Sequence, residues 1–545
     1  MFYFRVLPSL LFCLPLGLSA QNRPAPPKLV VGIVVDQMRY DYLYRFASQY
    51  GEGGFKRLLG EGFSCENTHY NYVPTYTAPG HAAIYTGTTP AVNGIIANEW
   101  FDPELGEHRY VTSDKRYKTV GAPGKVGQHS PSVLLSSTVT DELKLSNGFR
   151  SKVVGICLKD RGSILPAGHI PNASYWFDDA TGHWITSDYY PDSLALPAWV
   201  QAFNGKKLAD QYMSTPWTPL KPARESYSNW ARFKSDKYGS IDANFPHNLP
   251  ALKKDGYGAL RFTPFGNTLT LDFALEAIDK MQLGQDAFPD FMCLSFSSTD
   301  YCGHQFGIHA EETEDVYVRL DLDIARLLTA LDQKFGKDQV LVFLTSDHGG
   351  GETPAHLNAL RIPSGVFDES KVEKMLEQAL MADLGTSGDY IKEVSNQQIW
   401  VNWNAVEDLE VDPIRMAGVI GDAMRHLPGV YEVFSREELM MLPTDFPFAA
   451  ELRRGIHPRR SGDLVFILDP AWHPDDELFK TGGATHGSTY AYDTHVPLLW
   501  YGWRIPVGET FSPVSITDIA PTLSAMLRIM EPNGNTGKII EALFR

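Results

Sequence analysis

The sequence has few cysteines, a shortage of positive charge and no apolar run long enough to span a membrane. Its 545 residues include five cysteines, none in the Cys-x-x-Cys spacing of a metal or redox site. Lys and Arg number 48 against 65 Asp and Glu, which gives a formal charge of −17. Because phosphate backbones attract basic proteins, this balance argues against nucleic acid as the main partner. It does not exclude a small anionic substrate at a local metal site.

The N-terminus has the features of a signal peptide at residues 1–20. Arg5 supplies the positive start, and residues 6–18 are mostly apolar. Leu18 fits poorly at position −3 of a cleavage site, so the cut site stays open, and a buried N-terminal helix is the alternative. We expect an exported, periplasmic protein with no membrane span in the mature chain, 21–545.

The mature chain keeps four cysteines, and the sequence does not determine whether they pair. An even number in an exported protein permits disulfides. Two of the four lie in apolar strand-like runs, where a buried free thiol is the better interpretation; these are Cys157 and Cys293. The other two are Cys65 and Cys302.

An alternation of strand-like and helix-like segments predicts an α/β fold. Unbroken apolar runs suit a mostly parallel sheet that helices cover on both faces. A helix is expected from about Glu312 to Lys334, where apolar residues recur at helical spacing, and another is expected after Thr517. The five strand-like runs are Leu29 to Val35, Val153 to Leu158, Phe291 to Phe296, Val340 to Leu344 and Val496 to Trp500.

Chemically active side chains follow several of these runs. Four of them lie within about four residues of the end of an apolar run: Asp36, Lys159, Asp300 and Asp347. Ligands of open α/β sheets bind beyond the carboxyl ends of the strands. One edge of the sheet can therefore gather residues that are far apart in the sequence.

Two regions interrupt the alternation, near 170–270 and near 355–480. The first is rich in Trp, Tyr, Pro and Asn, and the second mixes short helices with a strand at Leu464 to Leu468. We interpret both as insertions that form a cap over the sheet edge of a single catalytic domain, 21–545. Surface elaboration without a substrate role is the alternative, and the sequence does not favour either.

The loops after the strands contain the side chains that bind catalytic zinc. Asp and His hold catalytic Zn²⁺, and two ions about 4 Å apart clamp a transferring phosphoryl group. Each motif is weak alone, since a single Asp or His in a loop more often caps a helix or faces solvent. Together they indicate a two-metal site with the candidate ligands Asp36, Asp300, His304, Asp347, His348 and His486.

Thr77 opens a predicted helix within the segment Pro74-Thr-Tyr-Thr-Ala-Pro-Gly-His81. A hydroxyl there lies at the positive end of the helix dipole, and free backbone amides nearby could bind a phosphoryl oxygen. Taken alone, Thr77 is better explained as a helix cap. The candidate metal ligands reverse that preference, because a metal lowers the pKa of a bound hydroxyl and makes it a nucleophile.

The joint pattern resembles the alkaline phosphatase superfamily and, more narrowly, the PafA-type bacterial phosphate monoesterases that use a threonine. The resemblance runs from about residue 28 to Leu523, with the motifs Val-Val-Asp36, Thr77-Ala-Pro-Gly-His, Asn98, Lys159-Asp-Arg161, Asp300 with His304, Asp347-His348-Gly and Thr485-His486-Gly. It implies a three-layer α/β/α sandwich with cap insertions. It also implies two Zn²⁺ ions, one held by Asp300, His304 and His486, the other by Asp36, Asp347, His348 and the Thr77 oxygen.

The resemblance further implies that Asn98, Lys159 and Arg161 bind the phosphoryl oxygens. An Arg fork and a Lys point charge suit the two negative charges of a phosphate monoester, whereas a diester carries one charge fewer. We expect the Lys and Arg side chains to start from one face of an extended chain. A solvated salt-bridge pair is the alternative. The expected reaction is hydrolysis of small phosphate monoesters through a phosphothreonine at Thr77.

Other functions stay open. A phosphodiesterase or nucleotide pyrophosphatase of the same superfamily is the nearest alternative, against which Lys159 and Arg161 argue. An exported zinc- or phosphate-binding protein without turnover would share the ligands. A sulfatase would require Cys or Ser followed by Pro and Arg in place of Thr77. A phosphoethanolamine transferase would require N-terminal membrane spans. The sequence has neither feature. The sequence does not determine the oligomeric state, for which we favour a monomer.

Overall fold

The computed structural model describes residues 25–191, 194–222, 245–409, 411–474 and 483–544. The predicted signal peptide at residues 1–20 lies outside them. Across the described residues, no helix is long and apolar enough to cross a membrane. All four cysteines of the mature chain are described, and they are buried free thiols.

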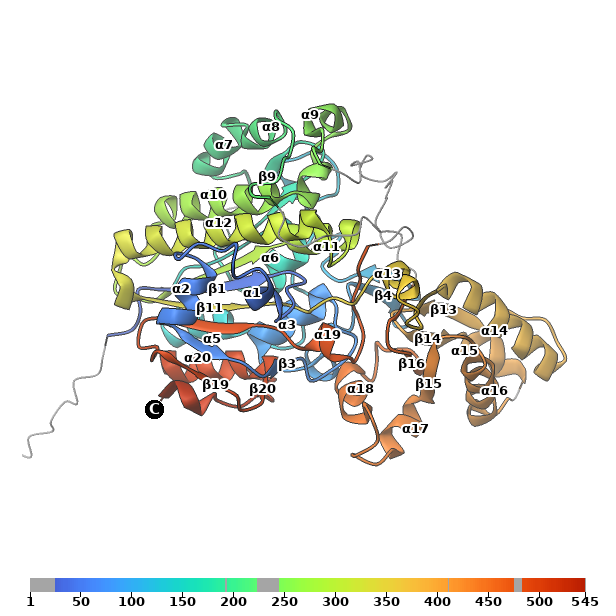
Figure 1. Cartoon of the computed structure of the whole chain (residues 1–545). Coiled ribbons are helices and arrows are strands. Elements are labelled where there is room, and N and C mark those ends of the chain that lie inside the picture. Colours follow the sequence, from blue (N-terminus) through green and yellow to red (C-terminus); the bar gives the residue numbers. More distant parts are fainter. Residues whose placement is uncertain (1–24, 192–193, 223–244, 410, 475–482, 545) are drawn as a thin grey trace, which may run out of the picture.

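A ten-stranded sheet forms the middle of the molecule (Figure 1). Its core consists of the neighbouring parallel strands β7 (Val153–Cys157), β10 (Asp290–Phe296), β1 (Leu29–Val35) and β11 (Val340–Thr345). These strands lie where the apolar runs predict them. The fifth run forms β18 (Leu498–Gly502), which pairs with β11 in the antiparallel direction. An apolar run does not encode the direction of its strand, so this feature required the structure.

Further strands extend the sheet at both sides. β8 lies parallel to β7, and the strands beyond it are antiparallel to their neighbours. Beyond β7 lie β8 (Ala173–Asp178), β9 (His183–Ser187) and β6 (Thr119–Val120), and beyond β18 lie β2 (Phe63–Cys65) and β19 (Gly508–Thr510).

Helices cover both faces of the sheet, which gives the expected three-layer α/β/α sandwich. Successive side chains of a strand face opposite sides. Accordingly, Val31 and Ile33 of β1 belong to one core, and Val30 and Val34 belong to the other. The first core contains residues of α2 (Phe55–Glu61), α10 (Pro264–Lys280) and α12 (Glu311–Phe335). The second contains residues of α3 (Thr77–Thr86), α5 (Val139–Ser146) and α20 (Ile519–Leu527).

The region near 170–270 is only partly an insertion, in contrast to the expectation. Its first two strands, β8 and β9, belong to the central sheet. The helices that follow lie on the outer side of α10 (Figure 1). They are α7 (Ala198–Gly205), α8 (Leu208–Tyr212) and α9 (Leu249–Leu252). β8 is buried throughout and β9 is buried except at His183, but polar residues such as Ser174, Asp178 and Thr186 interrupt their sequences. They therefore lack the long continuous apolar run by which the other strands are recognised.

The region near 355–480 forms a body with its own core (Figure 1). Four antiparallel strands lie in the order β13 (Ile391–Ser395), β14 (Gln398–Val401), β16 (Leu464–Leu468) and β15 (Val430–Ser435). The strand predicted at Leu464 to Leu468 is β16. Two helices, α14 (Glu369–Leu384) and α16 (Pro413–Arg425), share the buried apolar residues of this sheet.

Gly32, in the middle of β1, allows helix α3 to pack closely on the sheet. A Cβ at this position would lie 2.6 Å from Cζ of Phe343 and closer still to the hydroxyl of Tyr85, a residue of α3. The Tyr85 hydroxyl donates to the Gly32 carbonyl at 3.4 Å. The position of the helix that begins at Thr77 therefore depends on the absence of a side chain in β1.

We predict that Gly32→Ala lowers the free energy of unfolding by about 1–3 kcal/mol, the usual cost of overpacking a full core. The matched control is Gly60→Ala in α2, where a new Cβ would meet nothing within 4 Å. That change should be neutral or stabilise by up to about 1 kcal/mol, because Ala favours a helix over Gly. Denaturant unfolding of both variants tests this, and equal stabilities for the two variants would contradict the packing argument.

Candidate active site

Three carboxylates meet at one edge of the sheet because three neighbouring strands end in register. Val35 of β1 pairs with Phe296 of β10, and Val34 pairs with Thr345 of β11. The residues that follow carry the carboxylates, which are Asp36, Asp300 and Asp347. All three are buried, with at most 3% of the residue exposed. The predicted gathering of these side chains at one sheet edge is what the structure contains.

A first group of possible metal ligands consists of Asp300, His304 and His486. Asp300 and His304 lie four residues apart in α11 (Ser298–Phe306), so both project from one face of this helix. The Nε2 atoms of His304 and His486 lie 3.1 and 3.7 Å from Asp300 Oδ1. The third residue arrives from a loop far along the chain.

A second group consists of Asp36, Asp347 and His348. His348 Nε2 lies 3.5 Å from Asp36 Oδ1 and 3.7 Å from Asp347 Oδ2. Neither of these two buried carboxylate oxygens has a hydrogen-bond partner among the described residues. Buried acceptors without partners are rare in folded proteins, and an ion is one of the groups that can satisfy them.

One imidazole from each group, His348 and His486, directs its Nε2 atom into the site. His348 Nδ1 lies 2.9 Å from the Gly349 carbonyl, and His486 Nδ1 lies 2.7 Å from the Thr75 carbonyl. Each Nδ1 therefore carries the proton and donates, which leaves Nε2 as an acceptor or metal ligand. The rings stack with their centroids 3.4 Å apart. Burial lowers the pKa of both His348 and His486, so both are neutral, as metal ligands must be.

Burial and mutual repulsion make the three carboxylates an unfavourable set without cations. Burial, and then the charges of Asp300 and Asp347, raise the pKa of Asp36 well above its ordinary range. Burial also acts to raise the pKa of Asp300, but His304 and Lys159 outweigh it and hold that pKa well below the ordinary range. The neutral imidazoles of His348 and His486, together with buried carboxylate oxygens that have no partner, fit the donor set that binds Zn²⁺.

Thr77 lies beside the second group. Its Oγ1 is 3.5 Å from Nε2 of His348, and the residue is 1% exposed. The N-cap of α3 is Tyr76 and not Thr77, so Thr77 is the first residue of the helix. Few backbone amides are free there, contrary to expectation: Ala78 N–H donates to Asn98 Oδ1 at 2.9 Å, and Pro79 has no N–H.

The same hydrogen bond orients Asn98. Because Oδ1 accepts from Ala78, the side-chain amide group Nδ2 is turned to the other side and is left for a further acceptor. The structure therefore links Asn98 to the helix start that carries Thr77. Asn98 immediately precedes β4 (Glu99–Asp102).

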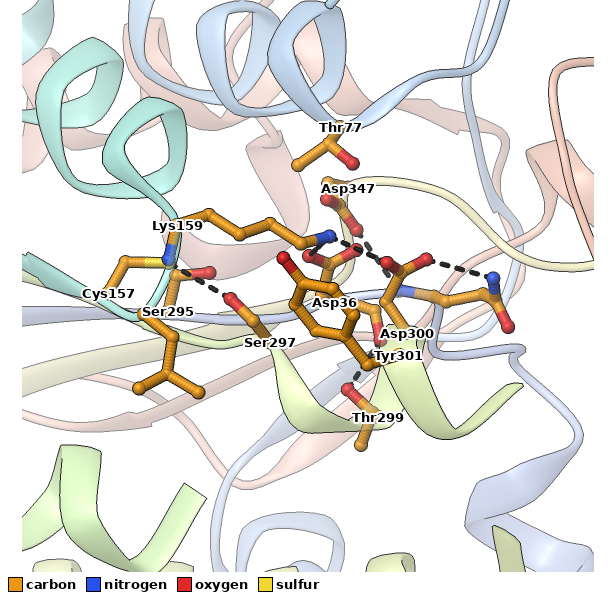
Figure 2. Close-up of polar contacts among 12 residues, drawn as sticks. Asp36, Thr77, Cys157, Lys159, Ser295, Ser297, Thr299, Asp300, Tyr301 and Asp347 are labelled. Carbon is orange, nitrogen blue, oxygen red and sulfur yellow. Dashed lines mark hydrogen bonds and ion pairs between the residues drawn. The ribbon is translucent and has the colours of Figure 1, made fainter. Parts of the chain in front are cut away.

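Lys159 and Arg161 do not both lie on an extended chain, which corrects the expectation. Lys159 is the N-cap of α6 (Asp160–Ala167), and Arg161 lies in its first turn, so the alternation of a strand does not apply. Lys159 Nζ lies 2.6 Å from Oδ2 of both Asp36 and Asp300 (Figure 2). The structure thus brings Lys159 in between the two ligand groups.

Arg161 lies apart from those carboxylates. Its Nη1 donates to the hydroxyl of Tyr110 at 3.0 Å. Its buried Nε has no hydrogen-bond partner among the described residues. One donor of a permanently charged guanidinium is thereby left for an anion.

Comparison with known proteins identifies the family. The sequence model of the type I phosphodiesterase / nucleotide pyrophosphatase family matches residues 30–489. The chain is 42% identical to the alkaline phosphatase PafA of Elizabethkingia meningoseptica, over 96% of each chain. It is 44% identical to a Myroides odoratus protein named calcium-transporting ATPase, over 96% of this chain and 95% of that one.

A crystal structure of wild-type alkaline phosphatase PafA superimposes with a TM-score of 0.91 at 41% identity, covering 96% of this chain and all of that one. The chain belongs to the type I phosphodiesterase / nucleotide pyrophosphatase family, among the PafA-type alkaline phosphatases. The three-layer fold expected from the resemblance is confirmed by this match.

In this PafA-type alkaline phosphatase, His81 supports the site, a role that its sequence motif alone does not predict. It is fully buried, its Nδ1 lies 2.8 Å from the Thr77 carbonyl and 3.3 Å from Asp347 Oδ2, and its Nε2 lies 2.9 Å from Ser295 Oγ. His81 lies four residues after Thr77 in the same helix, and such pairs share a face. This spacing is the sequence feature from which its contact with the site could be predicted.

Two further supports have no local motif by which sequence could find them. Arg261 donates to the carbonyls of Leu158 and Phe177 at 3.0 and 2.9 Å, and thereby fixes the backbone beside Lys159. Asp493 accepts from Ser488 N at 2.8 Å and holds the loop that carries His486. Burial raises the pKa of Asp493 to about 7.

Proposed function

We propose that this alkaline phosphatase hydrolyses small phosphate monoesters through a phosphothreonine at Thr77, with two Zn²⁺ ions as cofactors. The observation that carries the proposal is the buried Thr77 hydroxyl, 3.5 Å from Nε2 of His348, a member of one of two groups of buried His and Asp. A binding protein without turnover has no need for a hydroxyl at this position, so that alternative is less well supported.

Asp300, His304 and His486 would hold one ion, and Asp36, Asp347 and His348 would hold the other, together with Thr77 Oγ1. The carboxylate oxygens of Asp36 and Asp347 without hydrogen bonds, and the His348 Nε2 atom that lies near both, support this assignment. When bound, Zn²⁺ at such a pair of sites supplies Lewis-acid stabilisation of the attacking and leaving oxygens.

Thr77 Oγ would attack phosphorus in line with the leaving group, forming a P–O bond as the bond to the substrate alcohol breaks. The alcohol takes up a proton and departs. Water then attacks the phosphothreonine, releases phosphate and returns the proton to Thr77. Asn98 Nδ2 would donate to a phosphoryl oxygen during both steps, an arrangement that its hydrogen bond to Ala78 prepares.

Lys159 and Arg161 would provide the preference for monoesters. Arg161 Nε is a buried donor without a partner, and the Lys159 ammonium lies at the centre of the site. Their charges meet the additional negative charge that only a monoester carries. The name of the matching sequence family favours a phosphodiesterase or nucleotide pyrophosphatase as the second candidate, and the two cations argue against it.

We also propose that the protein is exported to the periplasm and acts as a monomer. The charge, apolar run and small residues of positions 1–20 support export. A cap role for the region near 355–480, and for the part of 170–270 that lies outside the central sheet, is likewise part of the proposal.

Thr77→Ala should reduce the turnover of an aryl phosphate by roughly a thousandfold or more, because the nucleophile is lost. Thr77→Ser keeps a hydroxyl and should retain a substantial part of the activity. Both variants should keep the melting temperature and most of the metal. The measurement is kcat for each protein with metal analysis in parallel, and parental turnover by the Ala variant would exclude Thr77 as the nucleophile.

Lys159→Ala/Arg161→Ala should lower kcat/KM for an aryl phosphate by about one to two decades for each lost contact, since a charge-assisted hydrogen bond contributes about 1.5–3 kcal/mol. Hydrolysis of a methyl aryl phosphate should fall much less.

The matched control is Arg150→Ala/Lys152→Ala, which removes the same charges with the same spacing at the opposite end of β7. It should leave both rates near the parental values. Equal losses on both substrates in the Lys159/Arg161 variant, or a parent enzyme that prefers the diester, would favour the phosphodiesterase.

A further inference from the structure

Gln37 forms hydrogen bonds to both groups of candidate metal ligands, one through its backbone amide and one through its side-chain amide. It follows Asp36 directly and is 3% exposed. Its backbone N–H donates to Asp347 Oδ1 at 3.1 Å, and its side-chain Nε2 donates to Asp300 Oδ1 at 2.9 Å. One residue is therefore bonded to a carboxylate of each group.

The backbone of Gln37 adopts an unfavourable conformation to make these contacts. Its φ is +59°, in the left-handed region that residues with a Cβ rarely occupy. Such conformations persist where the surroundings over-determine them, and they concentrate at functional sites. Here the hydroxyl of Tyr317 also donates to the Gln37 carbonyl at 3.2 Å, so the whole residue is held.

Two glycines of the ligand motifs make room for the Gln37 side chain. A Cβ at Gly303 would overlap Oε1 of Gln37 and lie 2.9 Å from its Cδ. A Cβ at Gly350 would lie 3.2 Å from its Cγ. Gly303 lies inside α11 between Asp300 and His304, where glycine weakens a helix, so the close approach of Gln37 gives a reason for it.

The side-chain contact involves the oxygen of Asp300 that faces the imidazoles. Oδ1 accepts from Gln37 and lies 3.1 Å from His304 Nε2, whereas Oδ2 faces Lys159. The donor on Oδ1 thus opposes rotation of the carboxylate, which would turn this oxygen away from His304 and His486. Hydrogen bonds to ligating carboxylates fix their orientation and are worth about 10–100-fold in metal affinity.

We infer that Gln37 is a positioning residue that joins the two ion sites: its side chain orients Asp300 and its backbone orients Asp347. This inference rests on the proposed two-ion function. Loss of the side-chain amide should weaken the site of Asp300, His304 and His486. The site of Asp36, Asp347 and His348 should be spared, because the backbone N–H survives any substitution except proline.

The test uses the zinc-loaded full chain and Gln37→Met, which keeps the side-chain length but has no amide donor. Chelator competition with metal analysis should show two tight ions in the parent. In the variant, one ion should dissociate about 10–100 times more readily while the other keeps its parental affinity. Parental affinity at both sites in the variant would overturn the inference. A parent that holds no zinc would instead refute the proposed function on which the inference rests.

Two further variants separate positioning from general stability. Gln37→Gly removes the side chain but relieves the left-handed backbone, so it should melt at a higher temperature than Gln37→Ala, while both lose the same ion. Tyr317→Phe removes the third hydrogen bond of Gln37 and leaves its two amides in place, so it should bind both ions as the parent does. Zinc loss that follows melting temperature across these variants would contradict a positioning role.

Discussion

Three buried carboxylates at one edge of the sheet are the constraint on which the rest of the site depends. Asp36, Asp300 and Asp347 lie together out of water, and like charges in such a place are unfavourable unless cations accompany them. Lys159 supplies one positive charge, 2.6 Å from two of the three carboxylates. Two divalent cations would supply four more, and the neutral imidazoles of His348 and His486 are oriented to share in binding them.

The fold produces this arrangement with a few strands and the residues that hold their loops. Parallel strands in register place the carboxylates, and Gly32 lets the helix that begins at Thr77 pack on the central strand. The body formed by residues near 355–480 reaches the same edge. The turn between β13 and β14 makes two hydrogen bonds there. Asn396 Nδ2 donates to the Glu99 carbonyl at 2.9 Å, and Gln397 Nε2 donates to the Gly487 carbonyl at 2.8 Å. These contacts adjoin Asn98 and His486, so the inserted body can influence the site through the backbone.

Sequence predicted the features that local pattern encodes. The central parallel strands are continuous apolar runs, and candidate ligands such as Asp36 and Asp347 follow their strands within two residues, so both could be predicted. Pairing direction is not local, which is why the antiparallel course of β18 was missed. The helix that begins at Asp160 is not predicted, because Lys159 and Arg161 follow the apolar run directly and the pattern favours a continued strand. Gln37 carries no motif, and its contacts join residues more than 260 positions apart.

The central claim is that a pair of zinc ions at these carboxylates makes the chain a phosphatase, and metal removal tests it most directly. The full-length mature enzyme would be treated with EDTA, freed of chelator, analysed for metal and assayed with p-nitrophenyl phosphate before and after addition of Zn²⁺. The account predicts that activity disappears with the metal and returns as about two zinc ions bind per chain. Full turnover by thoroughly metal-free protein would contradict it.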